Sequence, residues 1–175
     1  MMRDLPPYLH CIPIPTPFPV GPVNVYLAEG DPLTLIDTGP RFGPAREALQ
    51  ESLAALGYSP AEVGRIILSH AHSDHCGLAA ELVAASGATV LAHPANFTEL
   101  ADYASGRARR LAFYIALMRE AGMPIGVMLA VGRTQRGYGR FAQAIAPDGA
   151  LEEGLTVRLG DENWRVLHTP GHTGG

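Results

Sequence analysis

Hydrophobic and polar positions follow strand-like and helix-like spacings in turn along the chain. Residues 23–28 and 33–36 are rich in Val, Leu and Ile and are separated by Glu29-Gly30-Asp31-Pro32, which predicts a β-hairpin. In residues 44–56, Ala45, Leu49 and Leu53 recur at helical spacing before Gly57, which predicts an amphipathic helix. A short helix is expected after it, because Ser59-Pro60-Ala61-Glu62 has capping-box spacing.

The middle of the chain continues the alternation of strands and helices. Residues 65–69 form a short apolar run that predicts a buried strand with His70 at its carboxyl end. A helix over 77–86 and a strand over 89–92 are expected to follow. From 97 to about 144 the pattern is helical, clearest around Leu111, Ile115 and Met118, and we interpret this segment as a cap-like insertion.

A second hairpin is predicted near the end of the sequence. Residues 155–159 and 164–167 are joined by Gly160-Asp161-Glu162-Asn163 and lead into Thr169-Pro170-Gly171-His172-Thr173. The 175 residues, 47% of them hydrophobic, fit a single domain over 1–175 with a mixed α+β fold.

Cysteine content restricts the chemistry of any metal site. Cys11 and Cys76 are too few for a disulfide framework, and neither belongs to a CxxC pair, so a bound metal must be held by imidazole and carboxylate. The sequence contains neither an apolar run of about 18 residues nor a signal-peptide pattern at its start. We therefore expect a cytoplasmic protein without a membrane partner.

The net charge of -4 argues against a general polyanion binder, but the basic residues are unevenly placed. All 13 are arginine, and residues 101–144 hold seven of them against Asp102 and Glu120, a local balance of +5. This concentration is typical of a solvated helix face, and an anionic group of a substrate is the alternative.

Four potential metal ligands lie within six residues: His70, His72, Asp74 and His75. Alternate side chains of an extended segment share a side, so His70 and His72 are expected to converge on one ion. As the backbone bends toward the next helix, Asp74 and His75 project at another angle and can reach a second ion. A polar surface loop is the ordinary alternative for such a cluster.

A catalytic zinc site uses about three protein ligands and water, so the first ion needs one more ligand. His172 is the candidate, because Pro170 and Gly171 fix the backbone of its turn after a predicted strand. A solvated turn histidine remains the alternative. His93 is interpreted as a structural histidine, with a place in the wall of the site as the alternative, and His168 as a histidine that supports a ligand. Cys76 is interpreted as a packing residue, with a thiolate ligand as the alternative.

Three motifs together resemble the metallo-β-lactamase superfamily: the HxHxDH loop, Leu35-Ile36-Asp37-Thr38-Gly39 and Thr169-Pro170-Gly171-His172-Thr173. Within it, the sequence resembles the glyoxalase II-like thioester and small-ester hydrolases more than the antibiotic-degrading lactamases. The resemblance implies an αββα sandwich, of which this chain would supply the N-terminal half and part of the second sheet, with 97–144 as the helical insertion.

The resemblance also implies roles for the individual residues. His70, His72 and His172 would hold the first metal, and Asp74 and His75 would contribute to the second. Asp37 would orient a ligand rather than bind metal, since ligating imidazoles usually need a partner on the other nitrogen. Members of the superfamily supply a bridging aspartate and a last histidine well beyond the TPGHT turn. These 175 residues contain neither, so we expect the domain to be incomplete at its C-terminus.

The function expected from these features is metal-assisted hydrolysis of a small thioester or ester, in the manner of hydroxyacylglutathione hydrolases. One or two zinc ions are expected, with iron or manganese as alternatives, and Asp74 is the catalytic residue that orients the nucleophile or accepts its proton. The expected partner is a small-molecule substrate, and an anionic group on it is the alternative that the arginines leave open. Three readings stay open: a nuclease or phosphodiesterase, a mononuclear iron oxygenase, and a non-catalytic metal-binding module. A homo-oligomer also stays open, whereas the overall acidity argues against nucleic acid.

Overall fold

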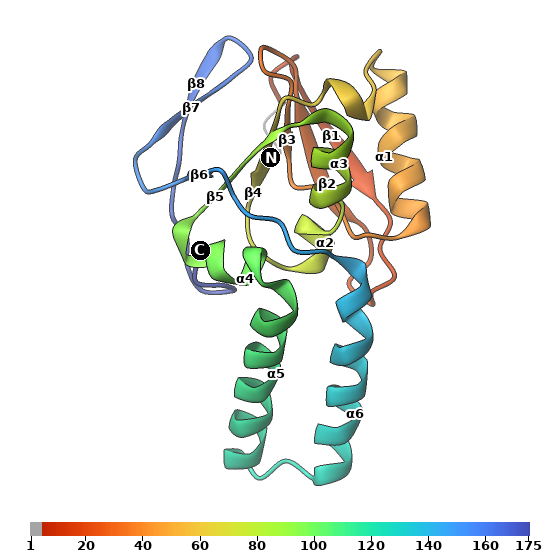
Figure 1. Ribbon diagram of the computed structural model, residues 1–175, viewed down its shortest axis with the longest axis vertical. Coiled ribbons are helices and arrows are strands. Elements are labelled where there is room, and N and C mark those ends of the chain that lie inside the picture. The colour runs from red at the N-terminus through yellow and green to blue at the C-terminus, as the bar shows by residue number, and fades with distance from the viewer. Residues whose placement is uncertain (1–4) are drawn as a thin grey trace.

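Six strands form one sheet in which the spatial order of the strands is their order in the sequence (Figure 1). In this computed structural model, which describes residues 5–175, β1, β2 and β3 pair antiparallel and β3 to β6 pair parallel. The strand bounds are Leu9–Ile14 (β1), Val23–Ala28 (β2), Thr34–Ile36 (β3), Arg65–Leu68 (β4), Thr89–Ala92 (β5) and Gly149–Ala150 (β6).

The first strand, β1, is an element that the sequence pattern did not indicate. Prolines crowd the start of the chain, and Pro13 lies within the strand itself. Proline is tolerated there because β1 is at the edge of the sheet, where one side of the backbone needs no ladder partner. The two-residue strand β6 was also not predicted, since it is too short to show a period.

Alternate side chains of the strands point to opposite faces of the sheet. On one face Val25, Leu27 and Ile66 belong to the main core, which is completed by the buried sides of α1 (Gly43–Ala55) and α3 (Ala79–Ser86). Helix α1 buries Ala45, Leu49 and Leu53, the positions that the periodicity indicated.

The opposite face of the sheet packs against a separate pair of strands. These are β7 (Thr156–Leu159) and β8 (Glu162–Arg165), which form the antiparallel hairpin expected from the sequence. Leu159 and Val157 of β7 contact a second apolar cluster that includes Leu9, Ala28 and Ile67. Helices, sheet and β7–β8 hairpin therefore form successive layers (Figure 1), and the mixed α+β fold expected from the sequence is confirmed.

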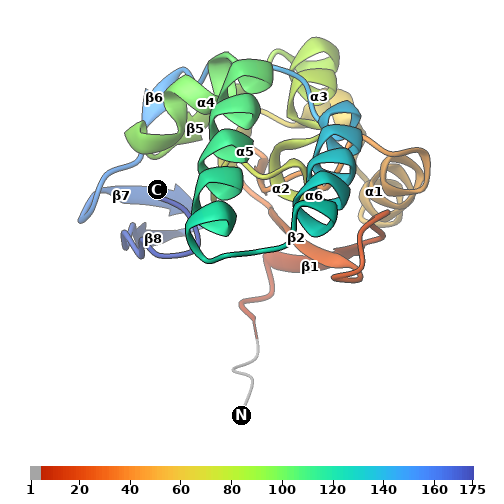
Figure 2. The same ribbon diagram turned by 90° about the horizontal axis from the view of Figure 1, so that it is seen from below.

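The segment expected to be a helical insertion forms two long helices that project from the layered body. Helices α5 (Tyr103–Glu120) and α6 (Ile125–Gly137) lie side by side and point away from the sheet (Figures 1 and 2). We call this pair the α5–α6 hairpin. No helix within residues 5–175 combines the length and the apolar character needed to cross a membrane.

The remaining elements are short helices in the connections between the strands and the longer helices. Residues 77–86 were expected to be one helix, but that helix begins at Ala79 and is preceded by a separate turn of helix, α2. The bounds of the remaining short elements are Pro60–Glu62 (η1), Ser73–Cys76 (α2), Pro94–Asn96 (η2), Phe97–Ala101 (α4) and Tyr138–Phe141 (η3). The predicted capping box of η1 is present, with both Ser59 and Glu62 in their expected roles.

Candidate metal centre

The candidate ligands gather where parallel strands end. Asp37 follows β3, and residues 69–77, which we call the metal loop, follow β4. The carboxyl ends of adjacent parallel strands meet at one edge of a sheet, which is the usual place for a site in such folds. The metal loop contains all four clustered residues, and α2 carries Asp74 and His75 within it.

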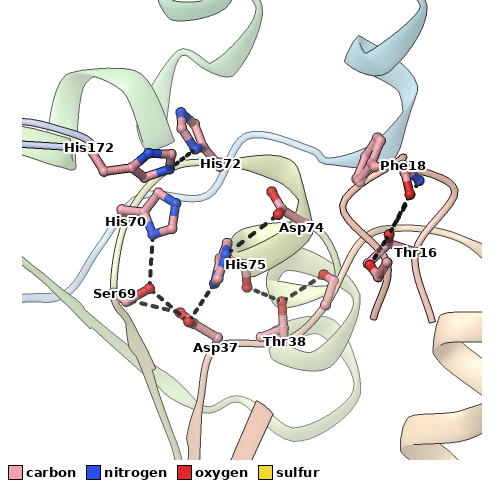
Figure 3. A network of polar contacts seen from close by, with 12 residues as sticks. Thr16, Phe18, Asp37, Thr38, Ser69, His70, His72, Asp74, His75 and His172 are labelled. Carbon is pink, nitrogen blue, oxygen red and sulfur yellow. Dashed lines mark hydrogen bonds and ion pairs between the residues drawn. The ribbon is translucent and has the colours of Figure 1, made fainter. Parts of the chain in front are cut away.

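Three imidazoles from two distant segments meet at this edge. One ligand atom from each of His70, His72 and His172 lies within 4.8 Å of the others, and we call these residues the histidine triad. Nε2 of His172 is 3.0 Å from Nδ1 of His72, although the two residues are 100 positions apart (Figure 3). Two nitrogens at zinc-ligand distance in a tetrahedral site are roughly 3.3 Å apart, so this spacing suits a shared ion.

His70 provides an independent test of whether a metal fits. Its side chain is only 9% exposed, and its buried Nε2 has no hydrogen-bond partner among residues 5–175. A buried ring nitrogen without a partner is costly. An ion held by the triad would satisfy it, while Nδ1 of the same ring lies 3.0 Å from the Ser69 hydroxyl. The donor set of three imidazoles suits zinc.

Asp37 contacts Ser69 and His75 of the metal loop and is not part of the histidine triad (Figure 3). Its Oδ2 lies 2.7 Å from Nδ1 of His75 and accepts a 2.7 Å hydrogen bond from the Ser69 hydroxyl, which in turn contacts His70. Its Oδ1 accepts from the backbone N–H of Ser69 at 2.8 Å. The carboxylate thus holds two rings of the metal loop, the orienting position that the family resemblance implied.

The backbone at this point is built around the same contacts. Asp37 has a left-handed conformation with φ of 61°, which Asp and Asn adopt more readily than most residues. The next residue, Thr38, donates from its backbone N–H (2.7 Å) and from its hydroxyl (2.9 Å) to the carbonyl of His75. The Asp-Thr pair after β3 therefore fixes both the backbone and the side chain of His75.

His75 and Asp74 lie beside the triad but outside it. Nε2 of His75 is 3.5 Å from Oδ2 of Asp74, and the His75 ring centroid is 4.2 Å from that of His70. Because Nδ1 of His75 is engaged by Asp37, its Nε2 is the atom left to bind a second ion together with Asp74. This second position stays a prediction.

Burial sets the protonation of two rings of the triad, those of His70 and His72. Burial first, and the neighbouring His75 second, lower the pKa of His70 to about 4. Burial first, and the Arg110 guanidinium second, lower that of His72 to about 3. Both rings are therefore neutral at pH 7, the form that binds metal. For His75, burial alone would lower the pKa, but the hydrogen bond and charge of Asp37 outweigh it and the pKa is raised.

A stacked pair of histidines supports the turn that carries His172. The rings of His93, after β5, and His168 are 4.0 Å apart and 10° from parallel. Nε2 of His168 lies 3.0 Å from the carbonyl oxygen of Gly174, across the turn from His172. The stack suits the expected structural role of His93, and both rings also line the cavity beside the triad, the alternative that the sequence left open for His93. Their spacing in the sequence gave no sign that they would meet.

Three further residues near the triad are Cys76, Ser69 and Thr38. Cys76 is fully buried, and burial raises the pKa of its thiol, so it packs rather than ligates. The roles of Ser69 and Thr38 were not predicted, because a hydroxyl beside a ligand has no recognisable spacing of its own.

Comparison with known proteins places this site in a family. Residues 18–175 match the model of the metallo-beta-lactamase superfamily. The chain is 35% identical over 161 residues to the probable metallo-hydrolase YqjP of Bacillus subtilis, which covers 92% of this chain and 49% of that protein. The chain spans about half the length of the curated relatives it matches.

Solved structures agree with the match. The metallo-beta-lactamase family protein TTHA1429 of Thermus thermophilus superposes with a TM-score of 0.82 at 29% identity, over 98% of this chain and 55% of its own. The class B3 di-zinc metallo-beta-lactamase LRA-12 from an Alaskan soil metagenome gives 0.64 at 24% identity, over 96% and 52%, which shows the shared fold. The chain belongs to the metallo-β-lactamase superfamily of metallo-hydrolases.

Proposed function

We propose that this protein hydrolyses a small thioester or ester with one or two zinc-type ions, the first held by the histidine triad. The observation that carries the proposal is the meeting of His70, His72 and His172 at one point, where the buried Nε2 of His70 has no hydrogen-bond partner in the described part of the chain. Three protein ligands are the number that leaves a catalytic zinc a position for water. A zinc-type ion bound there would lower the pKa of a bound water molecule and polarise the carbonyl group of the substrate.

Asp74 is placed to accept or donate a proton beside the triad. Its side chain is 22% exposed, its Oδ2 lies 3.5 Å from Nε2 of His75, and it follows His72 by two positions. A carboxylate in that place can orient the attacking water or take up its proton. Asp37 is engaged by the Ser69 backbone and hydroxyl and by the His75 ring, so it acts by positioning those groups.

A cavity of about 390 Å³ borders the triad and supports a small substrate. His70 and His172 line it together with apolar side chains such as Leu151, Val157 and Trp164. Apolar walls beside a polar reacting centre suit a carbonyl compound with an organic substituent. The choice of a thioester or ester rests on the likeness to glyoxalase II-like hydrolases in the sequence.

A nuclease or phosphodiesterase is the second candidate. The observation that favours it is the arginine concentration of the α5–α6 hairpin, since arginine is a common phosphate contact. RNA binding that weakens steeply with salt would support this candidate.

The test uses the complete natural protein. Metal content is measured by elemental analysis, and turnover is measured on a panel of glutathione and coenzyme A thioesters, simple esters and phosphodiesters. We expect zinc-type metal and turnover of a thioester or ester. Iron with oxygen consumption would instead support the oxygenase, and bound metal without turnover would support a binding module.

Variants connect the activity to the site. His70→Ala and Asp74→Asn are expected to abolish turnover, with loss of the metal held by the histidine triad only in the first. His10→Ala is the matched control, because His10 pairs with Glu29 in the β1–β2 hairpin and does not contact the triad. Turnover that survives in both site variants would refute the proposal.

A further inference from the structure

Between α5 and α6 lies a groove that the metal centre does not use. Its volume is about 870 Å³, within the range of small-molecule sites. The two helices run side by side (Figure 2), and side chains of both line the groove.

The walls of the groove are apolar along its length. Leu111 and Ile115 line it from α5, and Met128 and Leu129 line it from α6. Leu129 is 53% exposed, and Ile125 near the tip is 71% exposed. Large apolar side chains exposed together mark a binding surface more often than isolated ones do.

Three arginines line the same groove against one acidic residue, Asp102. Arg107 and Arg136 lie at the end near the body, and Arg119 lies toward the tip. The arginine ion pairs of residues 5–175 involve only Arg41, Arg46, Arg110, Arg158 and Arg165. Arg107 donates to the carbonyl oxygen of Gln135, which fixes its direction but leaves its charge uncompensated. The groove therefore complements an anion.

The basic end of the groove adjoins the metal loop. Tyr103 is buried at its base, and Gly139 of η3, which packs against α2, also belongs to the lining. Arg110 of α5 is close enough to His72 to act on its pKa. In the view along the hairpin, α2 lies behind the space between α5 and α6 (Figure 2).

Charge also decides against a second copy of the chain as the occupant. Residues 103–141 carry seven arginines and one acidic residue, Glu120. Two such hairpins placed together would repel each other. A small amphiphile with one negative group satisfies both the apolar walls and the arginines.

We propose that this groove binds the apolar chain of an anionic amphiphile, with the anionic head between Arg107 and Arg136 and the chain between the two helices. The occupant would be a medium-chain carboxylate. Under the proposed function, on which this last step rests, that carboxylate would be the product that hydrolysis of an acyl thioester or ester releases.

Binding of decanoate to the complete protein tests the groove. Acetate is the comparison ligand, because it carries the same carboxylate without the chain and reports binding at the metal alone. Calorimetry is expected to show saturable binding of decanoate that acetate does not displace. Arg107→Ala and Arg136→Ala should each weaken it about tenfold, as loss of a charge-assisted contact does.

Matched controls separate the groove from the rest of the hairpin. Ile115→Asp should weaken decanoate binding about tenfold by placing a charge in the apolar wall. Phe113→Asp and Arg133→Ala alter exposed positions on the same helices outside the lining and should leave binding within about twofold. Circular dichroism checks that every variant is folded, and the arginine variants test the groove independently of Ile115→Asp.

The outcomes distinguish the groove from the proposed function. Decanoate binding that follows the variants, without turnover of any acyl ester, would keep the groove and remove the assigned function. Turnover without dependence on chain length, together with no decanoate binding, would overturn the groove alone. Self-association that Ile115→Asp abolishes, with no decanoate binding, would also overturn it and identify a second copy as the occupant.

Discussion

The carboxylate of Asp37 and the ring of His75 are in contact at 2.7 Å, although 38 positions separate them in the chain. The contact joins the end of β3 to the metal loop after β4, the neighbouring parallel strand. It fixes which nitrogen of His75 faces the triad. A residue outside the ligand set therefore controls how the candidate ligands are presented.

Asp37→Asn is expected to weaken metal binding roughly 10- to 100-fold, the usual effect of removing an outer hydrogen-bond partner. Asparagine tolerates the left-handed backbone at this position, so the fold should be retained. Competition with a chelator measures the affinity. Asp37→Ala should also lower the melting temperature, because alanine fits that conformation poorly. Unchanged affinity in Asp37→Asn would show that the carboxylate does not orient the ligands.

His172→Ala is expected to reduce zinc affinity by more than about 100-fold, because it removes a ligand rather than the partner of one. His172 is exposed, so the stability of the metal-free protein should change by about 0.5 kcal/mol or less. Zinc titration and thermal unfolding measure the two effects. His10→Ala should alter neither zinc binding nor its stoichiometry. Full zinc binding by His172→Ala would remove it from the site.

His93 is expected to act on the metal through the ring of His168. His93→Phe keeps an aromatic ring for the stack, whereas His93→Asn keeps only an acceptor for the N–H of Ala95, which His93 caps at present. We expect zinc affinity to fall about tenfold in the Asn variant and to be largely retained in the Phe variant. The absorption spectrum of the cobalt-substituted protein should shift in the Asn variant alone. Loss of affinity in the Phe variant alone would indicate that the cap, not the stack, supports the turn.

Glu81 of α3 should make stability depend on acid pH. Its hydrogen bond with Arg46, and then that with Arg41, lower its pKa below the ordinary value of 4.5. Its contribution is therefore present above pH 4.5 and is lost as the pH falls through the lower folded-state pKa. Glu81→Gln should cost about 1 kcal/mol or less at pH 7, since the pair is partly exposed.

Urea unfolding at pH 7 and at pH 3 measures this dependence. The difference in the free energy of unfolding between Glu81→Gln and the parent protein should shrink at the lower pH, because the contribution of the carboxylate is lost as the pH falls. Glu47→Gln is the comparison variant, because Glu47 lies in the neighbouring helix α1 and takes no part in an ion pair among residues 5–175. An equal difference at both pH values would contradict the assignment.

Much of the layered body could be predicted from the sequence because its determinants are local. The alternation in residues 23–28, the spacing of Ala45, Leu49 and Leu53, and the turn residues 160–163 act within a few positions of each other. Strand β2, helix α1 and the β7–β8 hairpin lie there in the structure, each within one or two residues of the expected bounds. Strand β1 was missed, since prolines obscured a pattern that only an edge position permits.

A cluster of imidazoles and a carboxylate after a buried strand could be predicted from the amino-acid sequence, because four of the residues lie within six positions of the chain. The contacts of His172 with His72, of His93 with His168 and of Asp37 with His75 become visible only in the folded chain. These contacts depend on the parallel order of β3, β4 and β5 and on the packing of the β7–β8 hairpin against the sheet. Their geometry is set by many weak contacts summed over the whole core, and no single stretch of residues carries that sum.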